Sequence, residues 1–157
     1  MVERSLLLFV LLCCVASSAF VVSPFVAGPR FQGVLRAVED TAEYEKALSA
    51  MTAFSNRYVK LSDTTYCSEK SVTSVVIRGL AEHKVALGAP LCPCRFYEDK
   101  QAEAKDGYWN CPCVPMRERK ECHCMLFLTD DNDFAGDATD ISVEEINALT
   151  RDQLAAT

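Results

Sequence analysis

Six cysteines stand as three pairs, and one residue separates the two cysteines of each pair. The pairs are Cys92-Pro93-Cys94, Cys111-Pro112-Cys113 and Cys122-His123-Cys124, which together span 33 residues. Thiolates act as nucleophiles, as metal ligands and as redox groups. Three kinds of site therefore compete for these thiols: a disulfide framework, a zinc site and an iron–sulfur cluster.

The spacing argues against a disulfide framework. Two cysteines one residue apart rarely bridge each other, because closing so small a ring strains the bond geometry. In two of the pairs the residue between them is proline, which fixes φ and pushes the preceding cysteine into an extended conformation. This spacing does not exclude disulfides between cysteines of different pairs.

A zinc site explains only part of the set. Structural zinc takes four ligands, usually with Cys-x2–4-Cys spacing. Six thiols and His123 exceed four ligands, and zinc leaves two thiols without a role. A zinc-binding structural or interaction module is the alternative function.

An iron–sulfur cluster accounts for the number of thiols. A cubane cluster uses four thiolates, and four from six leaves the two that a disulfide needs. A cluster beside a disulfide would convert single electrons into two-electron dithiol reduction. The chain has no Gly-x-Gly-x-x-Gly motif for a flavin or nicotinamide cofactor. The number of cysteines alone predicts four cluster ligands and two disulfide cysteines. It does not identify which four are the ligands.

The run Cys-Pro-Cys-x16-Cys-Pro-Cys-x8-Cys-His-Cys resembles the signature of a known family, the catalytic (beta) subunit of plastid-type ferredoxin:thioredoxin reductase. Segments 71–84, 87–95, 108–129 and 131–136 also read like that family, and the resemblance covers roughly 40–150. It implies an oxidoreductase that takes electrons from ferredoxin and reduces thioredoxin disulfides with a [4Fe-4S] cluster as cofactor. It also implies a heterodimer with a small variable (alpha) subunit.

The resemblance assigns a role to each thiol. It implies that Cys94 and Cys124 form the redox-active disulfide and that Cys94 attacks thioredoxin. His123 is interpreted as a proton donor or a group that stabilises the Cys124 thiolate, with a packing residue as the alternative. The remaining four cysteines are implied to be the metal ligands: Cys92, Cys111, Cys113 and Cys122.

Residues 1–36 read as a bipartite targeting segment, and residues 37–157 as the catalytic domain. Residues 1–19 are signal-like, with an apolar run over 5–15 followed by small residues. Residues 20–36 are transit-like, with two arginines and no acid. The junction Ser18-Ala19-Phe20 resembles that of algae with secondary plastids, and an ordinary secretory signal is the alternative. An oxidising secreted setting suits neither a cluster nor reduced ferredoxin, so we expect the plastid stroma.

The charge restricts the partners. The chain has 16 basic and 22 acidic residues, and residues 1–36 hold three of the basic residues but one acid, so the mature part has a net charge of −8. Such a chain repels nucleic acid and anionic membranes, and we expect neither as a partner of the mature form. The basic run of Arg117, Arg119 and Lys120 either steers an acidic protein or is a solvated turn.

The expected fold is a small, mainly α domain with little or no sheet, whose helices pack around a loop-rich cluster and disulfide site. Segment 88–124 has few aliphatic residues, which favours organisation by a metal centre. Asp40 is the expected cap of the first helix, and Val72, Val75, Val76 and Leu80 are the expected buried face of the second. The helices are predicted over 39–60, 70–87, 95–105 and 142–149, with a short buried strand or extended segment over 125–129.

Overall fold

The structure is a computed structural model, and it describes residues 41–155, with side chains as far as Arg151. The regular structure in this range is helical. The targeting segment expected over 1–36 and the expected cap Asp40 lie outside the described residues. The helices are α2 (Ala42–Ser62), α3 (Lys70–Leu87), α4 (Lys100–Asp106), α5 (Val114–Arg119) and α6 (Val143–Ala155).

Helix α2 confirms the first predicted helix. Thr41 caps it, because its side-chain oxygen accepts a hydrogen bond from the Tyr44 backbone N–H at 3.1 Å. At the other end Asp63 takes the left-handed conformation, and its backbone N–H donates a hydrogen bond to the Val59 carbonyl. Buried residues recur every three or four positions along this helix and include Tyr44, Leu48, Met51, Ser55 and Val59.

Helix α3 has the predicted bounds, and Gly88 ends it with φ of 75°. Its buried face is turned slightly from the expected one. Ile77 is fully buried, whereas Val75 is 49% exposed, so the expected burial of Val75 is wrong. The buried face includes the small residues Thr73 and Ser74, which a pattern of valines does not reveal.

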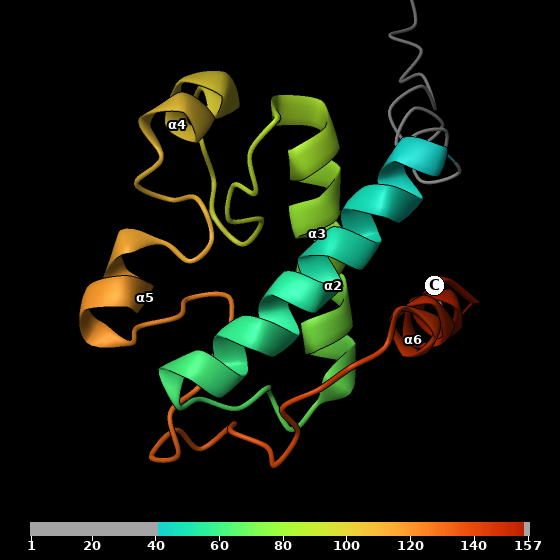
Figure 1. Cartoon of the computed structure of the whole chain (residues 1–157), viewed down its shortest axis with the longest axis vertical. Coiled ribbons are helices and arrows are strands. Elements are labelled where there is room, and N and C mark those ends of the chain that lie inside the picture. The colour runs from blue at the N-terminus through green and yellow to red at the C-terminus, as the bar shows by residue number, and fades with distance from the viewer. Residues whose placement is uncertain (1–40, 156–157) are drawn as a thin grey trace, which may run out of the picture.

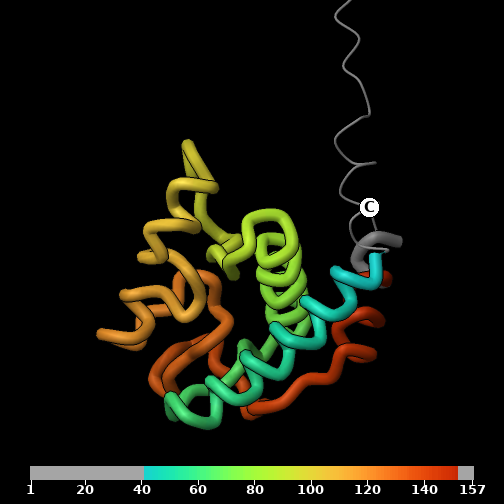
Figure 2. The backbone as a smooth tube through the Cα atoms, turned by 45° about the horizontal axis from the view of Figure 1, so that its top comes forward, coloured from blue at the N-terminus to red at the C-terminus, as the bar shows by residue number. Residues whose placement is uncertain are grey.

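Helix α3 is the centre of the fold. Helices α2 and α6 both pack against it. In Figures 1 and 2, α4, α5 and the loops around them lie on the side of α3 away from α6. The core between these elements contains, among others, Leu48, Ile77, Leu80, Cys92, Met116, Leu126, Phe127 and Ile146. The cysteine-bearing loops are thus part of the core.

Within residues 41–155 the strand-type pairing consists of isolated bridges and no sheet, which confirms the predicted fold class. These bridges are Thr65 with Leu128, Cys67 with Ala135, and Leu91 with Asn110. The segment expected as a strand or extended stretch over 125–129 is buried at Leu126, Phe127 and Leu128, but only Leu128 pairs. No helix in the described range is long and apolar enough to cross a membrane.

Two helices near the site differ from expectation. Helix α4 begins at Lys100 rather than at 95, because the Asp99 carboxylate accepts the backbone N–H groups of Gln101 and Ala102, both at 3.0 Å. Helix α5 was not expected, although Pro115 near its start is an ordinary helix-start signal. Ser142 caps α6 at the predicted start, and that helix continues to Ala155 rather than ending at 149.

Candidate redox site

Backbone hydrogen bonds join the loops that carry the first two cysteine pairs. The Cys92 N–H donates to the Trp109 carbonyl at 3.0 Å, and the Cys111 N–H donates to the Pro90 carbonyl at 2.8 Å. The bridge between Leu91 and Asn110 lies within the same pairing. Two cysteines that are 19 positions apart in the chain are therefore fixed side by side. The Cys111–Pro112 peptide bond is cis.

The third pair lies within a tight turn. The Met125 N–H donates to the Cys122 carbonyl at 3.1 Å, and Met125 itself has φ of 55°. Burial raises the pKa of Cys122, and the backbone N–H groups of Phe127, Leu126 and Cys124 oppose that rise by donating to its sulfur. Backbone N–H groups aimed at a thiolate are a common feature of iron–sulfur ligands.

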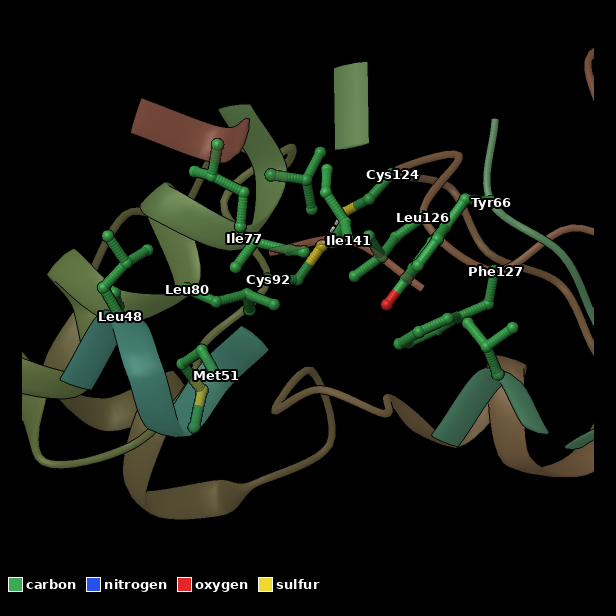
Figure 3. Packing of buried hydrophobic residues seen from close by; sticks show 14 of the residues in the cluster. Leu48, Met51, Tyr66, Ile77, Leu80, Cys92, Cys124, Leu126, Phe127 and Ile141 are labelled. Carbon is green, nitrogen blue, oxygen red and sulfur yellow. Dashed lines mark hydrogen bonds between the residues drawn. The ribbon is translucent and has the colours of Figure 1, made fainter. Parts of the chain in front are cut away.

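The first and third pairs meet at their sulfurs. Cys92 Sγ lies 2.7 Å from Cys124 Sγ, and both residues are buried in the core beside Leu126 (Figure 3). Cys94 contacts both thiols as a hydrogen-bond acceptor, although it is itself exposed to solvent. None of the seven cysteines in the described range forms a disulfide. The structure therefore brings together the expected reactive pair, Cys94 and Cys124, with the expected ligand Cys92.

The three thiols in this contact differ in their affinity for a proton. Hydrogen bonds donated by the thiols of Cys124 and Cys92 lower the pKa of Cys94 to about 4. The same contacts raise the pKa of Cys124, because its S–H donates to the two neighbouring sulfurs. The exposed member of the pair is thus the thiolate and the buried member is the thiol.

Five of the six paired cysteines line one cavity of about 620 Å³. Its wall includes Cys92, Cys111, Cys113, Cys122 and Cys124, and the four expected ligands are among them. Although Cys111 as a residue is half-buried, desolvation raises the pKa of its thiol well above the ordinary value, and the nearby cysteine thiolates add to that rise.

The donor set fits an iron–sulfur group. Several thiolates in one desolvated cavity repel one another, and a cationic metal centre relieves both the repulsion and the desolvation. The cavity is also large enough for a group of several atoms. Among the residues that the structure describes, no three Cys, His, Asp or Glu side chains converge closely enough to hold one metal ion.

Several polar and aromatic side chains also line this cavity. His123 and Trp109 line it, and His123 is exposed. Arg119 and Lys120, from the basic run, also line it and are exposed. Arg119 pairs with Glu121 at 2.9 Å, so part of the positive charge of this run is balanced within the chain. Cys67 is buried and does not line this cavity, which fits a cysteine that packs as a small apolar side chain.

Helix α3 positions the first cysteine pair, and sequence reasoning missed this. Gly79 lies so close to Pro93 that a Cβ placed there would be 2.7 Å from the Pro93 Cβ. One turn further on, His83 Nδ1 lies 2.7 Å from the Leu91 carbonyl oxygen. A glycine in the middle of a helix is the one sequence signal that could have shown a close approach.

The sequence places His83 on a charged stretch of its helix, which predicts a solvated histidine, and the structure corrects this prediction. Because the Leu91 carbonyl can only accept, Nδ1 carries the proton, and Nε2 accepts from Lys100 Nζ at 3.2 Å. Burial lowers the pKa of His83, and the charge of Lys100 lowers it further. A neutral histidine therefore links α3 and α4 to the backbone beside Cys92.

The fold and the site together define a class: a small helical redox protein in which an exposed cysteine, Cys94, contacts two buried cysteines beside a cavity lined by further cysteines. The family model for the ferredoxin thioredoxin reductase catalytic beta chain matches residues 41–149. This chain belongs to that family.

Curated relatives agree with the family assignment along most of their length. The chain is 57% identical over 136 residues to the chloroplastic ferredoxin-thioredoxin reductase catalytic chain of Spinacia oleracea, covering 87% of this chain and 93% of the relative. It is 68% identical over 104 residues to the catalytic chain of a Synechocystis species, covering 66% and 88%. It is 59% identical over 103 residues to that of Porphyra purpurea, covering 66% and 87%.

Proposed function

We propose that this chain catalyses the reduction of thioredoxin disulfides with electrons from ferredoxin. The observation that carries the proposal is the grouping of the exposed Cys94 with the buried Cys92 and Cys124, whose sulfurs lie 2.7 Å apart, beside a cavity lined by further cysteines. The family assignment supports the same reaction, because the relatives are ferredoxin-thioredoxin reductases by name.

The ligands of the cofactor are proposed to be Cys92, Cys111, Cys113 and Cys122. All four line the same cavity, and Cys94 does not line it. The cofactor that suits four thiolates is a [4Fe-4S] cluster, which when bound would supply electrons to the site one at a time. Burial and backbone N–H donors around Cys122 suit a thiolate that is permanently bound to metal.

The thiol chemistry follows from the two different cysteines. The Cys94 thiolate attacks one sulfur of the thioredoxin disulfide, so the thioredoxin S–S bond breaks and a Cys94–thioredoxin mixed disulfide forms. Cys124 then gives up its proton and attacks Cys94, which forms the Cys94–Cys124 disulfide and releases thioredoxin as a dithiol. Thioredoxin gains two electrons from the enzyme, one proton from Cys124 and one proton from solvent. Two electrons from ferredoxin and one proton from solvent then restore the Cys94 thiolate and the Cys124 thiol.

The direction of electron flow is favourable. Plant-type ferredoxins lie near roughly −400 mV and thioredoxin lies near roughly −270 mV. A difference of about 130 mV for two electrons corresponds to about 6 kcal/mol, at about 1.4 kcal/mol per 30 mV. The protein must still couple one-electron and two-electron steps. We propose that Cys124 serves this coupling, and its contact at 2.7 Å with the proposed ligand Cys92 supports the proposal.

His123 is proposed to serve the proton steps. It follows Cys122 and precedes Cys124, it lines the cavity, and it is exposed. An imidazole at this place can exchange protons between solvent and the Cys124 thiol. A His123→Gln variant should keep its visible absorption and lose turnover, whereas a packing role would leave turnover unchanged.

The partners and the compartment are part of the proposal. The catalytic chain is expected to work as a heterodimer with a small variable (alpha) subunit in the plastid stroma. Residues 1–36 are proposed to direct it there as a bipartite signal and transit sequence, and chloroplastic relatives support the compartment. N-terminal sequencing of the protein from isolated plastids should find a start near residue 37, and a start near residue 20 would instead fit a simple secretory signal.

The reaction is tested with reduced ferredoxin, oxidised thioredoxin and the purified enzyme under anaerobic conditions. The wild-type enzyme should form thioredoxin dithiol in proportion to ferredoxin oxidised, with two ferredoxins consumed per disulfide because ferredoxin carries one electron. Cys94→Ser should abolish dithiol formation, and Cys67→Ser is the matched control that should keep it. A wild-type enzyme that forms no dithiol would contradict the proposal.

A further inference from the structure

Phe96 lies two residues after Cys94, and its side chain is 91% exposed. This is the largest exposed fraction among the large hydrophobic side chains in the described range, which also include Leu61 at 77% and Phe134 at 58%. One exposed hydrophobic side chain on a surface is ordinary and has no meaning by itself. The position of Phe96 beside an exposed nucleophile is what calls for an explanation.

The backbone around Phe96 is fixed on both sides. Tyr97 is buried, and its hydroxyl donates to the Cys92 carbonyl at 3.0 Å. The Arg95 guanidinium stacks over the Trp109 ring, 3.6 Å from its centroid. Because both neighbours are tied to the site, the outward direction of Phe96 belongs to the folded structure and is set before any partner binds.

We propose that Phe96 is a docking contact for the folded disulfide protein that Cys94 attacks. This inference rests on the proposed function, and the occupant is thioredoxin. When two cysteines form a disulfide, their Cα atoms lie about 4.4–6.8 Å apart. The Cα of Phe96 lies at most about 7 Å from that of Cys94, because each residue spans at most about 3.6 Å. A folded partner that brings its sulfur onto Cys94 therefore lies within reach of the exposed Phe96 ring.

The chemistry of Phe96 defines what the partner must present. A phenyl ring has no hydrogen-bonding group, so the surface that covers it must be apolar and must lie beside the partner's disulfide. Aromatic side chains that become fully covered at the centre of an interface are frequent hot spots of binding energy. A small disulfide lacks such a surface and can react at Cys94 without touching Phe96.

The test compares a protein substrate with a small disulfide. In Phe96→Ser, the KM for thioredoxin should rise about tenfold or more, as expected for an aromatic hot spot, while kcat changes little. The rate with bis(2-hydroxyethyl) disulfide and the visible absorption of the enzyme should not change. Phe134→Ser is the matched control, because Phe134 is also exposed and lies in a different loop, where its carbonyl accepts from the Ser68 N–H. The KM of this variant for thioredoxin should equal that of the wild type.

Three results would overturn the inference. The first is an unchanged KM for thioredoxin in Phe96→Ser. The second is an equal loss of rate with the small disulfide, which would mean that Phe96 shapes the reactive pair. The third is a shift of the enzyme to a smaller assembly together with an unchanged KM, which would assign Phe96 to self-association. Failure of the proposed function looks different, because the wild-type enzyme would then reduce the small disulfide and leave thioredoxin oxidised.

Discussion

Replacing Gly79 with alanine puts a methyl group against Pro93, the residue between Cys92 and Cys94. The new Cβ would lie 2.7 Å from the Pro93 Cβ and 3.0 Å from its Cγ. Carbon atoms in contact lie about 3.5–4.0 Å apart. The proline ring, and with it the two cysteines on either side, must therefore retreat from α3 by about 1 Å.

Two effects on stability oppose each other in this variant. Alanine is favoured over glycine inside a helix by about 0.8–1 kcal/mol. Overpacking a tight contact costs about 1–3 kcal/mol. The net change in the free energy of unfolding is then a loss of about 1 kcal/mol, which leaves most of the enzyme folded.

The effect on activity is expected to be much larger than the effect on stability. Cys94 must sit within bonding reach of Cys124, and a misplacement of about 1 Å can lower a rate by about 100-fold. Thioredoxin reduction by Gly79→Ala should fall by about that factor. Val75→Ala is the matched control, because Val75 is an exposed position on the same helix. Full activity together with a small gain in stability would refute the reasoning, since helix propensity alone predicts that result.

Three further predictions concern the hydrogen bonds that hold the scaffold. Asn56→Ala removes bonds to the backbone of Ile141 at 2.9 and 3.1 Å and from the Tyr66 hydroxyl at 2.7 Å, and denaturant unfolding should show a loss of about 3 kcal/mol; a loss below about 1 kcal/mol would contradict it. Burial raises the pKa of Tyr66 above its ordinary value of 10.0. The unfolded chain therefore loses this proton first, and stability should fall above about pH 10 by up to about 1.4 kcal/mol per pH unit, more steeply than in Tyr66→Phe; equal slopes would exclude this effect. His83→Leu should cost about 1 kcal/mol by releasing the Leu91 carbonyl, whereas His83→Asn can retain that bond, and equal losses in the two variants would show that the bond contributes nothing.

Much of the helical frame could be predicted because its signals are local. The valines and leucines of α3 recur at helical spacing, Gly88 supplies the left-handed end, and Ser142 caps α6. The rotation of α3 could not be predicted in detail, because Thr73 is buried only through its contact with neighbouring elements. Val75 has the more apolar side chain and is half exposed, which no propensity scale anticipates.

The site was predictable as a set of residues and not as a geometry. The spacing of the six cysteines indicates shared chemistry, and the family resemblance supplies a division into four and two. Neither shows that Cys92 and Cys124 touch, since this depends on backbone pairing between distant loops. His83 was misjudged for the same reason, because its partner Leu91 comes near only when the chain leaves α3 and turns back.

The proposed function depends most on the division of the six thiols into four cluster ligands and two reactive cysteines. Iron and acid-labile sulfide should be measured in anaerobically purified wild type, Cys94→Ser and Cys111→Ser, together with visible absorption. The account predicts about four iron atoms per chain in the wild type and in Cys94→Ser, and loss of iron in Cys111→Ser. A colourless wild type with stoichiometric zinc, or loss of iron in Cys94→Ser, would contradict it.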